Sequence, residues 1–213
     1  MNLRDSENIW VLGIFLGITA LVAALLLALV SDWTAGPIKA AQENTRNLML
    51  KRLHLNEFDK TGSSIVKNGI SFCAVYNKGK CVGFVGQGSN RLGYGGEIEI
   101  MVGFTLDGRI TAVQILRHHE TPGLGANVCD RKFQRTILNL SAEAPEVPEN
   151  IYLDQFNGKE AAKSGDWKIV KDNGEFIYRT GATVTARAVT ALVNDIAAEF
   201  AKNRAEIQEK SVL

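Results

Sequence analysis

Cysteine and histidine are scarce in this sequence, with three of each among 213 residues. The cysteines form no CxxC pair, and none is spaced from a histidine as the ligands of a zinc site are. This scarcity argues against a zinc or iron–sulfur site, and we expect no bound metal. The odd number of cysteines does not identify the cellular compartment.

An excess of charge of either sign is also missing. The 24 lysines and arginines nearly balance the 23 aspartates and glutamates, and the sequence contains no basic run and no basic–aromatic array. This balance argues against nucleic acid as a partner, because binding to a phosphate backbone requires a basic surface. With 22% charged and 46% hydrophobic residues, the composition is that of one folded domain with an appendage.

Charge is absent altogether from residues 9–30. As a helix with a rise of about 1.5 Å per residue, this segment would extend roughly 33 Å, enough to cross a hydrocarbon core of about 30 Å. Trp10 and Trp33 lie near its ends, as interfacial anchors do. A cleaved signal peptide would have a shorter apolar region followed by a small-x-small site. We therefore predict an N-terminal tail over residues 1–8 and a retained transmembrane helix over residues 9–30.

The positive charges do not determine the orientation of this helix. The N-terminal tail carries Arg4 and the terminal amine, opposed by Asp5 and Glu7, whereas the other flank carries Lys39 and Arg46. Because basic residues favour the cytoplasmic side of a membrane, this nearly balanced count leaves both orientations open.

The rest of the sequence predicts one α+β domain. We expect a helical connector over residues 31–62, the domain over residues 63–203 and a C-terminal tail over residues 204–213. Turn signals between apolar segments predict two β-hairpins, with strands over residues 71–76, 81–85, 97–104 and 110–116. The sheet should therefore be mainly antiparallel, with flanking helices.

The segments outside these hairpins are less regular. Residues 86–96 contain five glycines, but their spacing matches neither GxGxxG nor GxxxxGKS/T. We interpret them as a flexible or tightly packed connection between strands, with a phosphate loop as the alternative. Further along the chain we expect a helix over residues 127–140, an acidic loop over residues 142–150 and strands over residues 151–156, 167–170 and 176–179.

Two polar segments are candidates for a functional site. The first, His118-His119-Glu120-Thr121-Pro122-Gly123-Leu124-Gly125, follows a predicted strand and contains a Pro-Gly turn. Adjacent histidines in an extended segment point to opposite sides, so we expect at most one of them to face a site. A capped turn with solvated histidines is the alternative.

The second polar segment, Thr180-Gly181-Ala182-Thr183, directly precedes a predicted amphipathic helix, in which apolar residues recur at three- and four-residue steps between Val184 and Phe200. Unpaired first-turn N–H groups and the helix dipole favour an anion such as phosphate there, and the small Gly181 and Ala182 permit its approach. The hydroxyls near this position belong to Thr180, Thr183 and Thr185. An ordinary N-cap before a core helix is the alternative.

Together the two segments resemble the FMN-binding domain of the G subunit of the Rnf electron-transport complex. The C subunit of the sodium-translocating NADH:quinone oxidoreductase shares this domain. The resemblance extends over essentially the whole chain and depends mainly on the pairing of ETPGLG with TGAT. It also includes Gly95-Gly96 through Val102-Gly103 and Asp107-Gly108-Arg109-Ile110.

The resemblance implies a set of site residues. In this family FMN is joined through its phosphate to the last threonine of an S/T-G-A-T motif, which is Thr183 here. Thr180, Gly181 and Ala182 would shape the access to it, and Thr185 is the nearest rival attachment point. The residues implied to line the flavin are His119, Glu120, Thr121, Gly123, Leu124 and Gly125. The chain departs from the family at Ile177, where the family often has Asp three residues before the S/T.

The implied function is electron transfer in a membrane-bound, ion-translocating oxidoreductase, with covalent FMN relaying electrons between ferredoxin and NAD branches and no catalytic residue in the chain. The implied partners are other Rnf subunits, membrane lipid and an FAD-dependent flavin transferase, and the domain would lie outside the cytoplasm at the inner membrane. Two alternatives stay open. One is a membrane-anchored assembly module without flavin, which Ile177 favours; the other is a hydrolase with a threonine nucleophile and His119 or Glu120 as its base.

Overall fold

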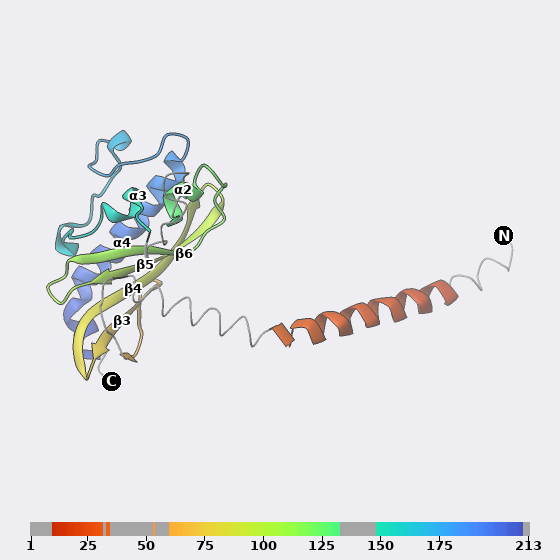
Figure 1. Cartoon of the computed structure of the whole chain (residues 1–213). Helices are drawn as coiled ribbons and strands as arrows, with labels where there is room; N and C mark the ends of the chain where they lie inside the picture. The colour runs from red at the N-terminus through yellow and green to blue at the C-terminus, as the bar shows by residue number, and fades with distance from the viewer. Residues whose placement is uncertain (1–9, 32, 35–52, 54–59, 133–147, 211–213) are drawn as a thin grey trace, which may run out of the picture. The chain divides into compact units, whose positions relative to one another are not determined.

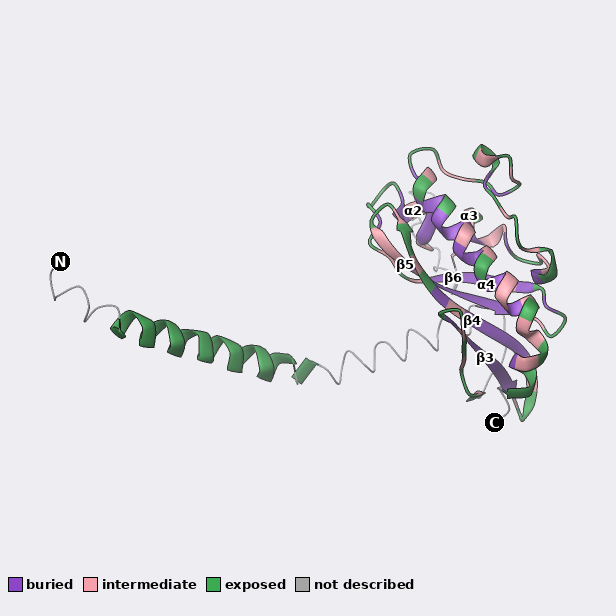
Figure 2. Ribbon diagram, turned by 180° about the vertical axis from the view of Figure 1, so that it is seen from behind, coloured by how far each residue is buried: buried purple, intermediate pink, exposed green. Residues whose placement is uncertain are grey.

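The computed structural model of the chain describes residues 10–31, 33–34, 53, 60–132 and 148–210. The chain divides into two compact units, residues 1–47 and residues 48–213. In the first unit, a helix from Trp10 to Ser31 has 22 residues and a mean hydropathy of 2.7, and none of it is buried (Figure 2). The predicted apolar N-terminal helix is therefore confirmed, and by length and composition it is able to cross a membrane.

The second unit is built on an antiparallel sheet with the strand order β1-β3-β4-β5-β6, in which β2 also pairs with β3 (Figure 1). The strands are β1 (Lys60–Thr61), β2 (Ile65–Lys67), β3 (Ile70–Asn77), β4 (Lys80–Gly93), β5 (Gly96–Phe104) and β6 (Ile110–Arg117). The predicted α+β class and both predicted hairpins, β3–β4 and β5–β6, are confirmed. We predicted a helical connector over residues 31–62, and most of it lies outside the described residues. Its last residues form strand β1 and not a helix.

The first hairpin forms where its turn sequence requires it. Lys78 and Gly79 at the centre of the β3–β4 turn have φ values of 49° and 76°. Positive φ at both central residues is the geometry of the turn that best matches the twist of paired strands. Gly79 suits this geometry, whereas Lys78 adopts it against its ordinary preference.

The prediction that residues 86–96 connect two strands is wrong for most of their length, because β4 continues to Gly93 and pairs with β5. Gly86 and Gly88 allow close packing between β4 and its neighbours. A Cβ at Gly86 would lie 2.7 Å from Cγ2 of Ile196, and one at Gly88 would lie 3.3 Å from Cγ1 of Ile70. The absence of side chains lets the long C-terminal helix lie close to the middle of the sheet.

That helix, α4 (Thr183–Lys210), crosses one face of the sheet (Figures 1 and 2). Its buried stripe includes Val193, Ile196 and Phe200, and the Phe200 ring is stacked on Phe104 with 4.1 Å between ring centroids. The amphipathic helix predicted from residue 184 is confirmed. It also contains residues 204–210, which we expected in a C-terminal tail, because Ile207 is fully buried.

Several short elements differ from their prediction. Helix α2 (Ala126–Cys129) ends at Asp130, which is extended, and not at residue 140; residues 133–147 lie outside the described part of the chain. Residues 151–154 form helix α3 (Ile151–Asp154) and not a strand, because the Asn150 side chain accepts hydrogen bonds from the N–H groups of Tyr152 and Leu153 and caps the helix.

The last two predicted strands are also wrong. In place of the strands predicted over residues 167–170 and 176–179, the structure has one isolated bridge between Ile169 and Phe176. The other regular elements of this region are the 3-10 helices η2 (Ala161–Lys163) and η3 (Val170–Asp172), and most of the residues around them lie in turns and irregular segments. Such short segments around turns carry too little periodicity to separate strand from turn.

Candidate cofactor-binding site

The Thr180-Gly181-Ala182-Thr183 segment leads directly into α4, as predicted, and Thr183 is the first residue of the helix. A turn precedes it, in which the N–H of Ala182 donates to the carbonyl of Arg179 at 3.0 Å. Gly181 has a φ of +86°, a left-handed conformation that side chains disfavour. Thr183 itself is half-buried, so its side chain is at the edge of the domain surface.

The first turn of α4 offers unoccupied hydrogen-bond donors. Within the described part of the chain, the backbone N–H groups of Thr183, Val184 and Thr185 have no hydrogen-bond partner, whereas the N–H of Ala186 donates to the carbonyl of Ala182 at 2.9 Å. These N–H groups and the positive end of the helix dipole favour an anion. The predicted anion position therefore lies at a helix N-terminus whose N–H groups are available to an anion.

The structure brings the two polar segments together. A Cβ at Gly181 would lie 3.4 Å from Cδ2 of Leu124, so the Pro-Gly turn lies against the turn before α4. The turn is fixed internally: the N–H of Leu124 donates to the carbonyl of Thr121 at 3.2 Å, and Asn127 Nδ2 donates to the carbonyl of Gly123 at 2.7 Å. Gly123 has a φ of +81° and open space where a Cβ would be.

Glu120 lies at the centre of this arrangement and is only 6% exposed. Its Oε2 accepts a hydrogen bond from the Thr185 hydroxyl at 2.7 Å, and its Oε1 accepts one from the Gly95 N–H at 3.1 Å. A Cβ at Gly125 would collide with the same carboxylate, and one at Gly93 would lie 2.6 Å from Oε1. The carboxylate is therefore enclosed by backbone and by one hydroxyl.

The two adjacent histidines point to different surroundings. His119 is exposed, whereas His118 lies between Glu120 and Asp130. The N–H of Glu120 donates to His118 Nδ1 at 3.1 Å, which makes Nδ1 an acceptor, so that Nε2 carries the proton toward Asp130 Oδ1 at 2.7 Å. Sequence reasoning missed Asp130, because nothing in its spacing from His118 indicates contact.

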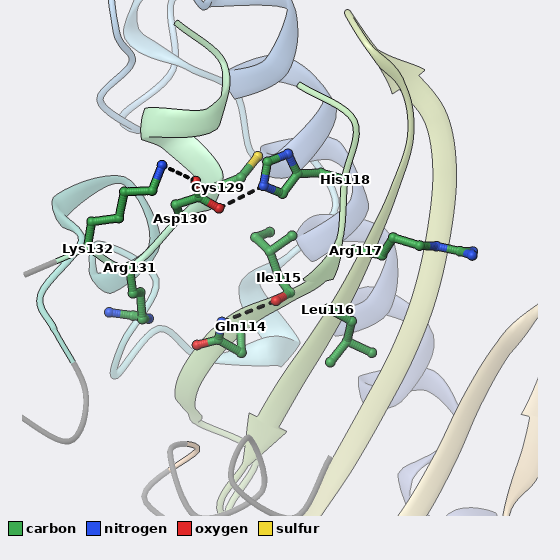
Figure 3. A pocket seen from close by; sticks show the side chains of 9 residues that line it. All are labelled: Gln114, Ile115, Leu116, Arg117, His118, Cys129, Asp130, Arg131 and Lys132. Carbon is green, nitrogen blue, oxygen red and sulfur yellow. Dashed lines mark hydrogen bonds and ion pairs between the residues drawn. The ribbon is translucent and has the colours of Figure 1, made fainter. Parts of the chain in front are cut away.

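The His118–Asp130 pair lines a cavity of about 480 Å³ (Figure 3). Burial alone would raise the pKa of Asp130, but hydrogen bonds from Lys132 and His118 outweigh burial and lower that pKa. Arg131 is paired with Asp154 at 2.6 Å. Burial and the nearby Glu120 and Asp130 carboxylates raise the pKa of Cys129 to about 12, so its thiol stays neutral at physiological pH. His118 is the one residue of the two polar segments that lines this cavity. The cavity is therefore separate from the position of Thr183.

A metal centre is not evident in the part of the chain that the structure describes, where no group of three or more His, Cys, Asp or Glu side chains could hold an ion. A threonine hydrolase with Glu120 as its base also lacks its geometry. The threonine that contacts Glu120 is Thr185, which is 1% exposed, so a substrate has no access to that hydroxyl.

The model of the FMN-binding domain family matches residues 93–198, which include both polar segments and every partner of Glu120. The G subunit of an ion-translocating oxidoreductase complex from Cereibacter sphaeroides is 31% identical over 204 residues, covering 92% of this chain and 85% of the relative. The chain belongs to this Rnf G-subunit family. Within it, the G subunit of Pseudomonas aeruginosa is 29% identical over 205 residues, covering 90% of this chain and 88% of the relative.

A third relative in the Rnf G-subunit family has a name that states the ion and the redox partners of its complex. The G subunit of the Na(+)-translocating ferredoxin:NAD(+) oxidoreductase complex of Acetobacterium woodii is 28% identical over 209 residues, covering 89% of this chain and 90% of the relative. The residues present fit the FMN cofactor of the family, because the open N–H groups of α4 follow closely on Gly181, and Leu124 of the Pro-Gly turn lies against that glycine.

Proposed function

We propose that this Rnf G subunit carries FMN in a phosphoester bond to the Thr183 hydroxyl and relays electrons within the membrane complex. The observation that carries the proposal is the first turn of α4, where a half-buried threonine hydroxyl adjoins three N–H groups without partners among the described residues. A phosphodiester keeps one negative charge, which these donors and the helix dipole stabilise.

Thr183 is a better attachment point than its neighbours. The Thr185 hydroxyl is buried and donates to Glu120, so a transferase has no access to it. Thr180 is exposed but precedes the helix, where the N–H donors do not converge. In the attachment reaction a flavin transferase would form the bond between Thr183 Oγ1 and the FMN phosphorus of FAD, break the pyrophosphate bond and release AMP.

The surrounding residues would orient the cofactor. Gly181 and Ala182 leave the approach to Thr183 open, and Gly123 and Leu124 form the opposite wall against Gly181. His119 and Thr121 are exposed and stay candidates for contacts with the flavin. FMN supplies the redox chemistry when it is bound, and the protein residues provide attachment and orientation, so none of them needs to act as a general acid or base.

The setting of this relay is the membrane. We infer that the apolar helix from Trp10 to Ser31 anchors the protein by a single pass in the inner membrane and that the domain lies outside the cytoplasm. The name of the Acetobacterium relative supports ferredoxin and NAD as the two ends of the electron path and other Rnf subunits as partners. Residues 63–203 as the limits of the FMN-binding domain stay a prediction.

Ile177 is the one residue that weakens the proposal. It is 42% exposed, and its backbone is fixed by Gln155, which accepts from its N–H at 2.6 Å and donates to its carbonyl at 3.2 Å. A transferase that reads a carboxylate at this position would meet an apolar side chain instead. The expected result is slower attachment and not a different attachment residue.

Covalent flavin is tested by fluorescence after denaturation. The full chain is produced in a bacterial membrane together with its flavin transferase, denatured and separated on a gel, with Thr183→Val and the control Thr61→Val on β1 alongside. We expect a fluorescent band for the wild type and Thr61→Val and none for Thr183→Val. A dark wild-type band, with the transferase active on another substrate, would contradict the proposal and favour a non-redox assembly module.

A further inference from the structure

Glu120 has a buried carboxyl group that takes no part in the proposed attachment at Thr183. Its carboxylate is turned into the protein, where only 6% of the residue is exposed and both oxygens accept hydrogen bonds. We propose that Glu120 is a positioning residue, which joins the three segments of the cofactor site and does not itself contact the cofactor. The inference rests on the proposed function only in treating these segments as the FMN site.

The three segments come from distant parts of the chain. Gly95, in the turn between β4 and β5, donates its N–H to Oε1 of Glu120 at 3.1 Å. Thr185, in the first turn of α4, donates its hydroxyl to Oε2 at 2.7 Å. Glu120 itself directly precedes the Thr121–Gly125 turn, in which Leu124 lies against Gly181. One carboxylate thus links the β4–β5 turn, the Pro-Gly turn and α4.

Burial makes both hydrogen bonds of the Glu120 carboxyl group important, because a buried polar group without partners is costly. Among the described residues, no lysine, arginine or histidine forms an ion pair with it. A buried carboxylate without a cation is stabilised by hydrogen-bond donors and by the positive end of a helix. The Gly95 N–H, the Thr185 hydroxyl and the α4 N-terminus supply these, so separating the segments would leave the carboxyl group without its donors.

The backbone of Glu120 is fixed as firmly as its side chain. Its N–H donates to His118 Nδ1, and His118 is in turn oriented by Asp130, which is paired with Lys132. Glycines then allow the closest approach: a Cβ at Gly95 would collide with the backbone of His119, and one at Gly125 would collide with the Glu120 carboxylate. These contacts leave Glu120 one position.

The consequence reaches the attachment residue through Thr185. Thr185 and Thr183 belong to the same helical turn, so a contact that fixes Thr185 also fixes the backbone that carries the Thr183 side chain and the open N–H groups. The expected role of the contact is to hold the first turn of α4, and with it Thr183, in place next to the contact between Gly181 and Leu124.

The test compares flavin attachment in matched variants of the full chain produced with its transferase. We expect Glu120→Ala and Thr185→Val each to lower the flavin bound per protein by roughly tenfold, as small displacements in preorganised sites do. Thr185→Ser keeps the hydroxyl and should bind as much flavin per protein as the wild type. The double variant should bind no less flavin than either single one, because both changes remove the same contact.

Val193→Ala is the stability control, because Val193 is fully buried in the middle of α4, away from these contacts. It should lower the thermal unfolding midpoint and leave the flavin content of the folded protein unchanged. Equal flavin loss in Val193→Ala and Glu120→Ala, or normal flavin in Glu120→Ala, would overturn the positioning role.

A second measurement needs no flavin. Hydrogen exchange of the full chain in detergent, produced without the transferase and followed by mass spectrometry, should be roughly tenfold faster in Thr185→Val for peptides containing Gly95 and Glu120, because local opening sets the exchange rate. Peptides from the middle of β5 should not change. Unchanged exchange at Gly95 and Glu120 would overturn the inference. A wild type without flavin would contradict the proposed function alone, since this measurement would still decide the role of Glu120.

Discussion

At its first turn, α4 leaves three N–H groups without partners among the described residues, whereas around Phe200 the same helix is packed against the rings of Phe72, Phe84 and Phe104. The first turn lies among glycines and carries exposed Val184 and half-buried Thr183. The comparison indicates a division of roles, in which the middle of the helix stabilises the domain and its beginning leaves donors available for a ligand.

The largest effect on stability should come from the aromatic contacts. Phe200→Ala removes a fully buried ring that three others contact and should lower the free energy of unfolding by about 3–5 kcal/mol. Urea unfolding of the full chain in detergent, followed by near-ultraviolet circular dichroism, measures this, with the exposed neighbour Lys202→Ala as the control. The flavin content per folded molecule should stay normal; its loss would mean that the two parts of α4 are not independent.

A smaller loss of stability, but a clear loss of flavin, should follow from Gly181→Ala. The left-handed φ of +86° should cost roughly 1–2 kcal/mol for alanine, and the added Cβ would lie 3.4 Å from Leu124, at the position where we propose that the cofactor is attached. Gly158→Ala is a matched control, because Gly158 has a φ of +77° with open space around it. Both variants should lose similar stability, and only Gly181→Ala should lose flavin. Equal flavin content in the two variants would contradict the proposal that the cofactor lies next to Gly181.

The smallest effect should be on the pH dependence of stability, through Glu206 in the last turns of α4. Hydrogen bonds from Lys210 and Lys67 lower the pKa of Glu206 from 4.5 to about 2. Because the folded-state pKa is below the unfolded one, this contribution to stability is complete above pH 4.5 and is lost as the pH falls toward 2. Thermal unfolding should therefore depend less on pH in this range for Glu206→Gln than for the wild type.

Salt provides the control for this last prediction. The ion pairs of Glu206 are partly exposed, so at about 1 M salt, where the Debye length is roughly 3 Å, the difference between the variant and the wild type should shrink. An unchanged pH dependence at low salt would show that the pairs contribute nothing measurable. Flavin content should not respond at all, because Glu206 lies beyond the site.

Features encoded locally could be predicted from the sequence. The turn at Lys78-Gly79 and the apolar stripe of α4 predicted the correct hairpin and helix, since both depend on neighbouring residues. The strand predicted over residues 151–156 was wrong because apolar residues after Asn150 fit either element, and the capping side chain decides for helix. The length of β4 was missed because its glycines are typical of a loop until α4 is placed against them.

The candidate site was predictable in part for the same reason. Thr180 to Thr183 could be placed at a helix N-terminus from periodicity, and the family resemblance paired that segment with the Pro-Gly turn. The contact between Glu120 and Thr185, the enclosure of Glu120 by Gly93 and Gly125, and the link from His118 to Asp130 all depend on tertiary packing. No spacing in the sequence encodes them, so Glu120 was predicted to line the flavin, and its burial between three segments was not foreseen.

Attachment of FMN at Thr183 is the central claim, and peptide mass spectrometry tests it most directly. Trypsin cleaves after Arg179 and Arg187 and would release one peptide that contains Thr180, Thr183 and Thr185, the three candidate residues. Fragmentation of this peptide from the membrane-produced protein should place the FMN phosphoryl group on Thr183 and on neither of the others. A peptide without FMN, or with FMN on Thr180 or Thr185, would contradict the account.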